Sequence, residues 1–104
     1  MLIRSQDKKS LCNYNSGIVT CFEKYDYEVI NNSMVPTKIE GYNIFFSNNG
    51  NEILLGFYST KEKAIKVLDM IESFYSNLQY TRFAGSDYSE FFDVIFQMPQ
   101  DEDV

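Results

Sequence analysis

Residues 42–71 read YNIFFSNNGNEILLGFYSTKEKAIKVLDMI, and this stretch decides the fold. Its first half holds two β-branched and aromatic runs, 42–46 and 53–58, on either side of the sequence Ser-Asn-Asn-Gly-Asn. The Asn-Gly pair readily adopts the positive φ angles that tight hairpin turns require. We therefore predict a β-hairpin over these residues.

The second half of the stretch predicts an amphipathic helix. Ser59 and Glu62 have the spacing of a capping box, with serine at the N-cap and glutamate three residues later. The residues that follow place apolar side chains on one stripe and polar side chains opposite, which predicts a single helix of about five turns. The stripe consists of Ala64, Val67, Leu68, Ile71, Phe74, Tyr75 and Leu78.

The residues before this stretch predict further strands. Two short apolar pieces around Ser-Gln-Asp-Lys-Lys-Ser within residues 1–14 indicate a strand pair. Residues 18–23 and 25–30 alternate with a period of two, which is typical of strands. We expect residues 31–37 to break the pattern, because Asn-Asn-Ser favours a turn and Pro36 has no N–H to donate to a ladder.

After the helix, residues 79–90 are polar and predict a loop, and the alternation through Met98 predicts a last strand that Pro99 ends. The expected fold is α+β: an antiparallel sheet of five or six strands covered by one amphipathic helix, which a last strand follows. A chain of 104 residues fits one domain, which we place at residues 1–99, with an acidic tail at 100–104.

The chain contains no histidine, so the commonest general base and metal ligand is missing. It also has neither GxGxxG nor a phosphate-binding GK[ST] loop. Two thiols nine residues apart, Cys12 and Cys21, match neither a redox CxxC motif nor a zinc knuckle, and are best interpreted as small buried side chains. We therefore expect a non-enzymatic protein with no cofactor and no metal.

The net charge of −6 is distributed unevenly. Residues 1–82 hold nine basic and nine acidic side chains, so the whole excess follows Arg82. Lys and Arg clusters are what nucleic acids and anionic membranes bind, and none is present here. The acidic excess instead favours a basic protein surface as partner. The residues that carry it are Asp87, Glu90, Asp93, Asp101, Glu102 and Asp103.

The candidate partner-binding residues follow from this charge and from the high tyrosine content. Exposed tyrosines combine contact area with a polar tip, and Tyr25, Tyr27, Tyr80 and Tyr88 are the best candidates for exposure. Acidity that begins before the last strand predicts an ordered acidic face, with charge setting the encounter rate. The predicted contact residues are Asp87, Tyr88, Glu90 and Asp93.

Two alternatives stay open at this stage. If Arg4 and Arg82 converge, they would hold a phosphate or carboxylate, as an oligomeric protein that sequesters a small nucleotide requires. Alternatively, the chain is a structural domain whose exposed sheet edge pairs with another copy in a homo-oligomer. The N-terminus has no signal-peptide core and no window is apolar enough to span a membrane, so we expect a cytoplasmic protein.

The chain also resembles a group of short uncharacterised proteins of low-GC Gram-positive bacteria, their phages and mobile elements. No activity of that group is known to transfer, but the resemblance implies a protein similar in kind to phage or mobile-element inhibitors of bacterial defence proteins. The segments that carry the resemblance are residues 2–8, residues 53–64 with 67–71, and residues 96–99.

Overall fold

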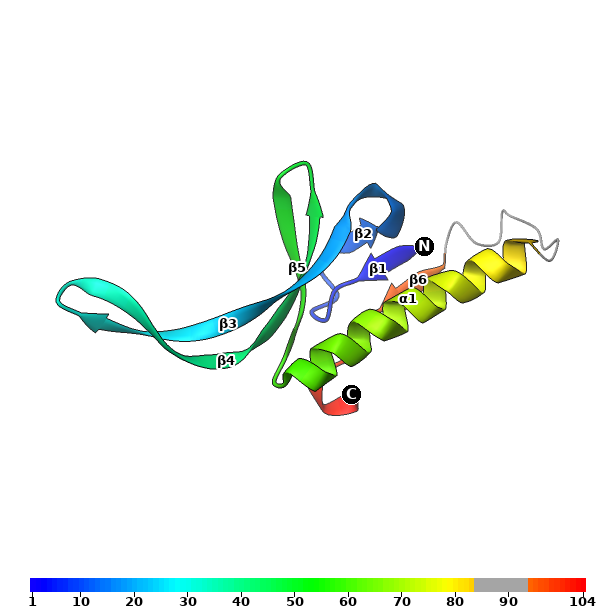
Figure 1. Cartoon of the computed structure of the whole chain (residues 1–104). Coiled ribbons are helices and arrows are strands. Elements are labelled where there is room, and N and C mark those ends of the chain that lie inside the picture. The colour runs from blue at the N-terminus through cyan, green and yellow to red at the C-terminus, as the bar shows by residue number, and fades with distance from the viewer. Residues whose placement is uncertain (84–93) are drawn as a thin grey trace.

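The computed structural model describes residues 1–83 and 94–104, and the side chains of residues 1–79 and 94–104. Figure 1 shows the path of the chain. Short 3-10 turns occur at Tyr14–Ser16 and Asp101–Asp103. The strands and the helix are β1 (Leu2–Arg4), β2 (Leu11–Asn13), β3 (Ile18–Ile30), β4 (Ser33–Asn48), β5 (Asn51–Tyr58), α1 (Lys61–Phe83) and β6 (Ile95–Gln97).

The α+β class and the single long helix are confirmed for the described residues, but the single sheet of five or six strands is wrong. The strands form two three-stranded sheets, in the orders β2-β1-β6 and β3-β4-β5. The predicted strand pair near the N-terminus exists as β1 and β2, and the last strand, β6, pairs parallel with β1.

Gln6, in the turn after β1, connects the two sheets by hydrogen bonds without a continuous strand ladder. Its Oε1 accepts a hydrogen bond from the N–H of Phe57 at 2.7 Å, and its Nε2 donates to the carbonyl of Phe57 at 3.1 Å. The backbone N–H of Gln6 also donates to the carbonyl of Leu55 at 2.7 Å. One residue thus satisfies the outer edge of β5 at Leu55 and Phe57.

The β3–β4 hairpin is longer than the sequence predicts. We expected residues 31–37 to be a break, but only Asn31 and Asn32 form the turn, and both have positive φ angles, 51° and 63°. Asparagine tolerates this conformation better than most residues. Pro36 lies within β4 opposite Tyr27, in a stretch where β4 has no neighbour on its other side, and such edge strands tolerate the missing N–H of a proline.

The hairpin predicted from residues 42–58 is confirmed as β4 and β5. Its turn residues Asn49 and Gly50 have φ angles of 50° and 82°, as the Asn-Gly pair predicts. The helix that follows is also present, but its cap differs. Thr60 Oγ1 accepts the hydrogen bond from the N–H of Lys63 at 3.2 Å, so Thr60, and not Ser59, occupies the N-cap. The helix continues to Phe83 and includes the start of the predicted loop.

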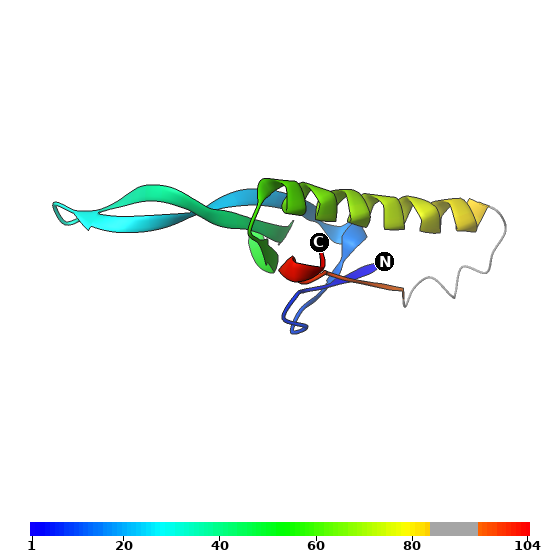
Figure 2. The same ribbon diagram turned by 90° about the horizontal axis from the view of Figure 1, so that it is seen from below.

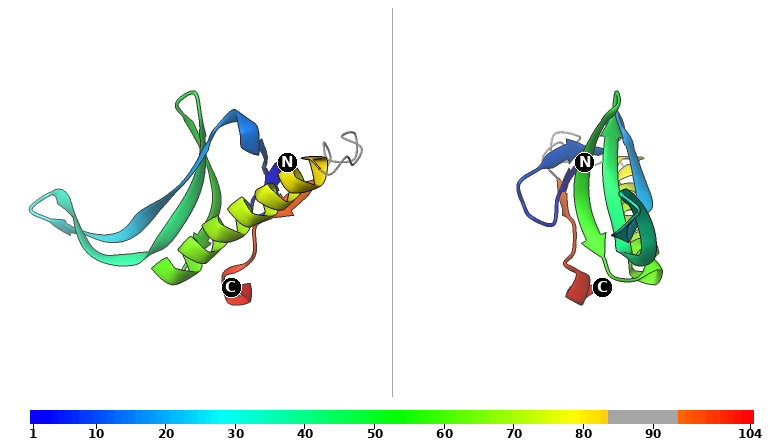
Figure 3. Two further views of the ribbon diagram at one scale, coloured as in Figure 1. Left: turned by 45° about the vertical axis from the view of Figure 1, so that its right-hand side comes forward. Right: turned by 90° about the vertical axis from the view of Figure 1, so that its left-hand side faces the viewer.

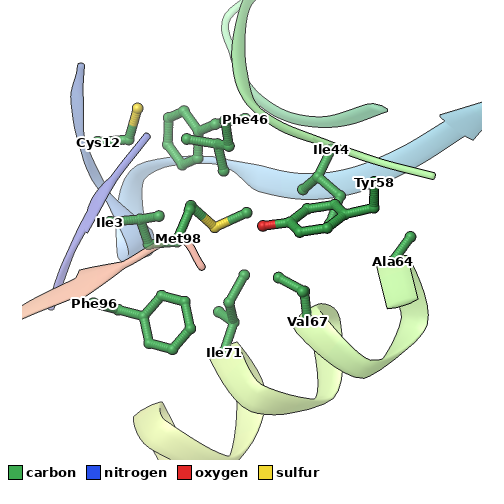
Figure 4. Close-up of a cluster of buried hydrophobic side chains, with 11 residues drawn as sticks. Ile3, Cys12, Ile44, Phe46, Tyr58, Ala64, Val67, Ile71, Phe96 and Met98 are labelled. Carbon is green, nitrogen blue, oxygen red and sulfur yellow. The ribbon is translucent and has the colours of Figure 1, made fainter. Parts of the chain in front are cut away.

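Both sheets and the helix contribute side chains to one core (Figure 4). From the predicted helix stripe, Ala64, Val67 and Ile71 are buried, whereas Leu68 and Phe74 are partly buried. No helix in the described part of the chain is long and apolar enough to cross a membrane. The buried core residues are Ile3, Cys12, Ile44, Phe46, Leu55, Tyr58, Ala64, Val67, Ile71, Phe96 and Met98.

The molecule is elongated, with principal extents of 63, 28 and 20 Å. Figures 1 and 2 show the reason: the outer part of the β3–β4 hairpin projects from one side of the core, and α1 runs away on the other side. The right-hand panel of Figure 3 views the molecule from the hairpin end. There the β3-β4-β5 sheet stands beside the β2-β1-β6 sheet. The helix therefore covers only the part of the β3-β4-β5 sheet nearest the core.

Candidate interaction surface

Residues 24–41 form a two-stranded projection, here called the arm. β5 pairs with β4 only from Tyr42 to Asn48, so the preceding part of β4 has β3 as its single neighbour. Within residues 1–83 and 94–104, no other strand and no backbone hydrogen bond occupies either outer edge of the arm. A two-stranded hairpin is only marginally stable in water, so the arm lacks the packing that stabilises the rest of the sheet.

Strand alternation divides the side chains of the arm between two faces. Successive residues of β3 point to opposite sides of the sheet, and directly paired residues share a side. In the observed register, Tyr25 lies opposite Ile39, Tyr27 opposite Pro36, and Val29 opposite Met34. We call this set the apolar face of the arm: Tyr25, Tyr27, Val29, Met34, Pro36 and Ile39.

The apolar face is the continuation of the sheet surface that forms the core. Strand periodicity places it on the same side as Ile44 and Phe46 of β4, which are buried against α1 and the β2-β1-β6 sheet. Because α1 begins at Lys61 and runs away from the arm, it covers this surface near the core and leaves its outer half open (Figure 2). Among the residues that the structure describes, none forms a covering layer over the core-type side chains of the arm.

The exposed fractions support this description. Val29 is 72% exposed, Met34 70% and Tyr27 53%. Burying one such side chain against a partner is worth up to about 1.5–3 kcal/mol, so several in one patch make a substantial driving force for association. Contiguous exposed apolar patches on a folded chain commonly mark interaction sites.

The opposite face of the arm is mixed in character. Lys24 lies 3.5 Å from Glu40, and Lys38 lies 3.5 Å from Asp26, both as exposed ion pairs. Such surface pairs contribute little to stability, about 0–1 kcal/mol each. Their effect is to neutralise both lysines of the arm within the chain itself, so the arm presents no free cationic cluster.

Tyr25 carries a further polar contact at the base of the arm. Its hydroxyl donates a hydrogen bond to the carboxylate of Glu23, two residues earlier on the same face. This hydrogen bond, followed by desolvation, raises the pKa of the Tyr25 hydroxyl. The phenol therefore stays a neutral donor at physiological pH, which keeps the apolar face free of a tyrosinate charge.

A pocket of 440 Å³ lies beside β3 on the side of the sheet that carries the apolar face. Val19 supplies its β3 wall, and two of its aromatic side chains, Tyr14 and Tyr75, have ring centroids 4.7 Å apart. The walls combine the apolar side chains of Val19, Leu68 and Ile71 with polar groups, so the pocket has an apolar part that suits an aliphatic side chain. The complete lining is Tyr14, Val19, Leu68, Ile71, Glu72, Tyr75 and Ser76.

The body of the β3-β4-β5 sheet also exposes apolar side chains on its other face. Ile18, Phe22 and Leu54 are exposed there, and the Phe22 and Phe45 rings lie 6.0 Å apart between centroids. The ammonium of Lys24 stands 5.3 Å above the Phe57 ring. These contacts cover part of the patch from within the chain, whereas the apolar face of the arm has no comparable cover.

The residues predicted to bind a partner lie outside the described residues. Asp87, Tyr88, Glu90 and Asp93 all fall within 84–93, so their role stays a prediction. Of the two arginines predicted to hold a nucleotide, Arg4 lies in β1 and its Nε donates to the carbonyl of Lys8 at 3.4 Å. Arg82 lies in the last turn of α1, but its side chain is not among those described.

Two of the tyrosines predicted to be exposed, Tyr25 and Tyr27, are exposed, and both belong to the apolar face. Sequence reasoning missed the β4 half of that face, because it expected residues 31–37 to break the strand; the missed residues are Met34, Pro36 and Ile39. The signal that identifies the arm is the Asn31-Asn32 pair, which permits a two-residue hairpin turn directly after the alternating run 25–30.

The cysteines and carboxylates of the described residues form no group of three or more that could hold a metal ion. Cys12 is buried, Cys21 is half-buried, and both are free thiols whose pKa values burial raises. Comparison of the chain with protein-family models, with curated proteins and with solved structures finds no match.

Proposed function

We propose that this protein is a non-enzymatic binding protein that acts by docking the apolar face of its arm against another protein chain. The observation that carries the proposal is the continuation of the core surface of the sheet into the arm without a covering layer, at Tyr27, Val29 and Met34. A protein partner supplies both things that the arm lacks, a cover for the apolar side chains and acceptors and donors for the strand edges.

The charges of the arm favour protein over nucleic acid as the partner. Nucleic-acid binding depends on unpaired Lys and Arg that neutralise phosphates. Both lysines of the arm, Lys24 and Lys38, are already paired with carboxylates of the arm. An apolar face flanked by neutralised charges matches instead the composition of a protein interface, which is apolar at the centre and polar at the rim.

The resemblance to short phage and mobile-element proteins makes a protein of the bacterial host, in particular of a defence system, the external partner that we propose to test first. Asp87, Tyr88, Glu90 and Asp93 would add a second contact if that partner is basic. Salt separates the two contributions: docking through the apolar face is insensitive to ionic strength, whereas acidic contacts weaken as salt rises.

The test compares two double variants of the full chain in affinity capture. Val29→Ser with Met34→Ser removes the two most exposed side chains of the apolar face. The matched control is Ile30→Ser with Val35→Ser, which removes two exposed apolar side chains from the opposite face of the same hairpin. We expect a protein retained by the wild-type chain and by the control to be lost from the first variant. Equal retention by both variants would refute the proposed docking face.

A further inference from the structure

We propose that the protein chain docked on the arm is a second copy of this protein, with β3 of the two copies paired antiparallel so that Tyr25 of one lies opposite Tyr25 of the other. This inference rests on the proposed function, since it names the partner of the same surface. It would join the β3-β4-β5 sheets of the two copies into one six-stranded sheet around a two-fold axis. Such isologous pairing uses one surface twice and closes on itself.

The free edge of β3 is the first ground for this assignment. β3 is the outermost strand of the β3-β4-β5 sheet, and in the described residues no backbone hydrogen bond reaches its outer side. The outer edge of β5, by contrast, is occupied by Gln6. Long uncovered edges pair with other chains unless they are protected, and of the two outermost strands of this sheet only β5 has a protected stretch, at Leu55 and Phe57.

The charges of β3 select the register. With Tyr25 on the two-fold axis, Lys24 of each copy lies opposite Asp26 of the other, which makes two attractive cross-strand pairs. If each residue pairs two positions further back, Lys24 lies opposite Lys24. If each pairs two positions further on, Lys24 lies opposite Glu28 but Asp26 lies opposite Asp26. Of these three registers, only the one centred on Tyr25 contains no like-charge pair. A shift by one would set the apolar face of one arm beside the mixed face of the other. β3 is therefore complementary to itself in this register.

The same register places the apolar faces of both arms on one side of the joined sheet. It also places the tip of each arm near the pocket beside Val19 of the other copy. Val29 of each copy comes opposite Cys21 of the other, on the core side of the sheet. Two residues further along β3, on that same side, Val19 forms one wall of the 440 Å³ pocket against α1. An exposed valine would thus lie beside the part of this pocket that Val19 lines in the second copy, so that the arm and a recess that can receive its tip are present on one chain.

Cysteine cross-linking tests the register directly, because the native Cys21 is one of the two reactive positions. Val29→Cys places a thiol opposite Cys21 of the second copy, and Tyr25→Cys places a thiol opposite its own equivalent. Directly opposed residues of an antiparallel pair have Cβ atoms close enough for a disulfide. We expect both variants to form disulfide-linked dimers under a mild oxidant, seen as a band of doubled mass in a non-reducing gel.

Met34→Cys is the matched control. Met34 is as exposed as Val29 and lies on the same face, but it belongs to β4, one strand away from the proposed junction. Random collision would cross-link it as readily as Val29→Cys, whereas the proposed register would leave it uncoupled. Equal cross-linking of the two variants, or none in either, would overturn the proposal. Circular dichroism of each variant checks that it is folded.

Sedimentation velocity of the reduced wild-type chain provides the second measurement. We expect a concentration-dependent dimer that the Val29→Ser, Met34→Ser variant does not form and that the Ile30→Ser, Val35→Ser variant does. A monomer at every concentration, combined with capture of a different protein through the apolar face, would overturn the dimer and leave the proposed function standing. A monomer that instead binds lipid vesicles through the arm, or that binds nothing, would overturn both.

Discussion

The carboxylate of Asp101 accepts a hydrogen bond from the backbone N–H of Ser59 at 2.8 Å, and so joins the C-terminal turn to the residue before the N-cap of α1. The Ser59 hydroxyl donates to the same oxygen at 3.1 Å, and Lys63 Nζ lies 3.7 Å from it. These contacts, the backbone hydrogen bond first, lower the pKa of Asp101. The predicted acidic tail is therefore tied to the body of the protein at this residue.

Asp101→Asn should lower the melting temperature at neutral pH by a few degrees, because the substitution keeps the shape and removes the charge. A depressed folded-state pKa stabilises the fold above the unfolded value of 3.8, and this contribution is lost as the pH falls through the folded pKa. The difference between wild type and variant should therefore shrink in acid. Thermal melts from pH 7 to pH 2 measure it. Asp103→Asn, an exposed change in the same turn, should match wild type throughout.

Tyr58→Phe should destabilise the protein by about 1 kcal/mol at neutral pH, the usual net value of one hydrogen bond. The Tyr58 ring is fully buried, and its hydroxyl donates to the carbonyl of Pro99 at 2.7 Å. Burial raises the pKa of Tyr58 above its ordinary value of 10. Its stabilising contribution is thus complete below pH 10 and declines above it, because only the unfolded chain then ionises.

Urea unfolding at pH 8 and above pH 10 distinguishes the two effects of this change. Wild type should lose stability across that interval more steeply than Tyr58→Phe. Tyr75→Phe is the matched control, because it leaves the Pro99 contact intact and should keep the alkaline loss that Tyr58 contributes. If the free energy of unfolding fell equally with pH in wild type and Tyr58→Phe, the Tyr58 hydroxyl would not be the group whose ionisation the folded state opposes.

Gly41→Ala should destabilise the base of the arm by about 1–3 kcal/mol, the typical cost of overpacking. A Cβ at this position would lie 2.3 Å from two atoms of the Phe57 ring and 2.8 Å from the carbonyl oxygen of Tyr58. Gly50→Ala is the comparison: nothing lies within 4 Å, and only its positive φ of 82° is strained. Urea unfolding measures the stability of both variants and of the double variant Gly41→Ala with Phe57→Leu. The double variant, which lacks the Phe57 ring, should recover part of the stability that Gly41→Ala loses.

Cys21 should react with a disulfide reagent before Cys12 does. Cys21 is half-buried, whereas Cys12 is 3% exposed. Burial raises the pKa of both thiols and slows both reactions, so accessibility decides their order. Mass spectrometry of the partly modified protein assigns the sites. Faster modification of Cys12 in the folded protein would contradict the burial described here.

The local elements were largely predictable, and their limits were less so. The Asn49-Gly50 turn, the helix stripe with Val67 and Ile71, and the short strand pair near the N-terminus follow from turn chemistry and periodicity, which act between near neighbours. The N-cap shifted from Ser59 to Thr60 because Asp101, distant in sequence, binds Ser59. The predicted break at residues 31–37 failed because Pro36 is tolerated where β4 has no neighbour, and the sequence alone does not reveal that edge.

The candidate site illustrates the same division. The sequence predicted that Tyr25 and Tyr27 are exposed. The pairing of Val29 with Met34 depends instead on the hairpin turn that brings the two strands together. Residues 87–93, on which the sequence-based interface depends, lie beyond what the structure describes. Neither the arm nor the pocket beside Val19 has a contiguous motif, because both are assembled from segments far apart in the chain.

The sequence by itself determined the class of the fold, the turns and the apolar stripes, because these depend on side-chain chemistry and on spacings of a few residues. The tertiary structure decided how the strands divide into two sheets and which part of the central sheet remains uncovered. The physical reason is geometric: the helix begins where β5 ends and runs away from the arm, so the same alternation that builds the core near Ile44 leaves Val29 and Met34 open to a partner.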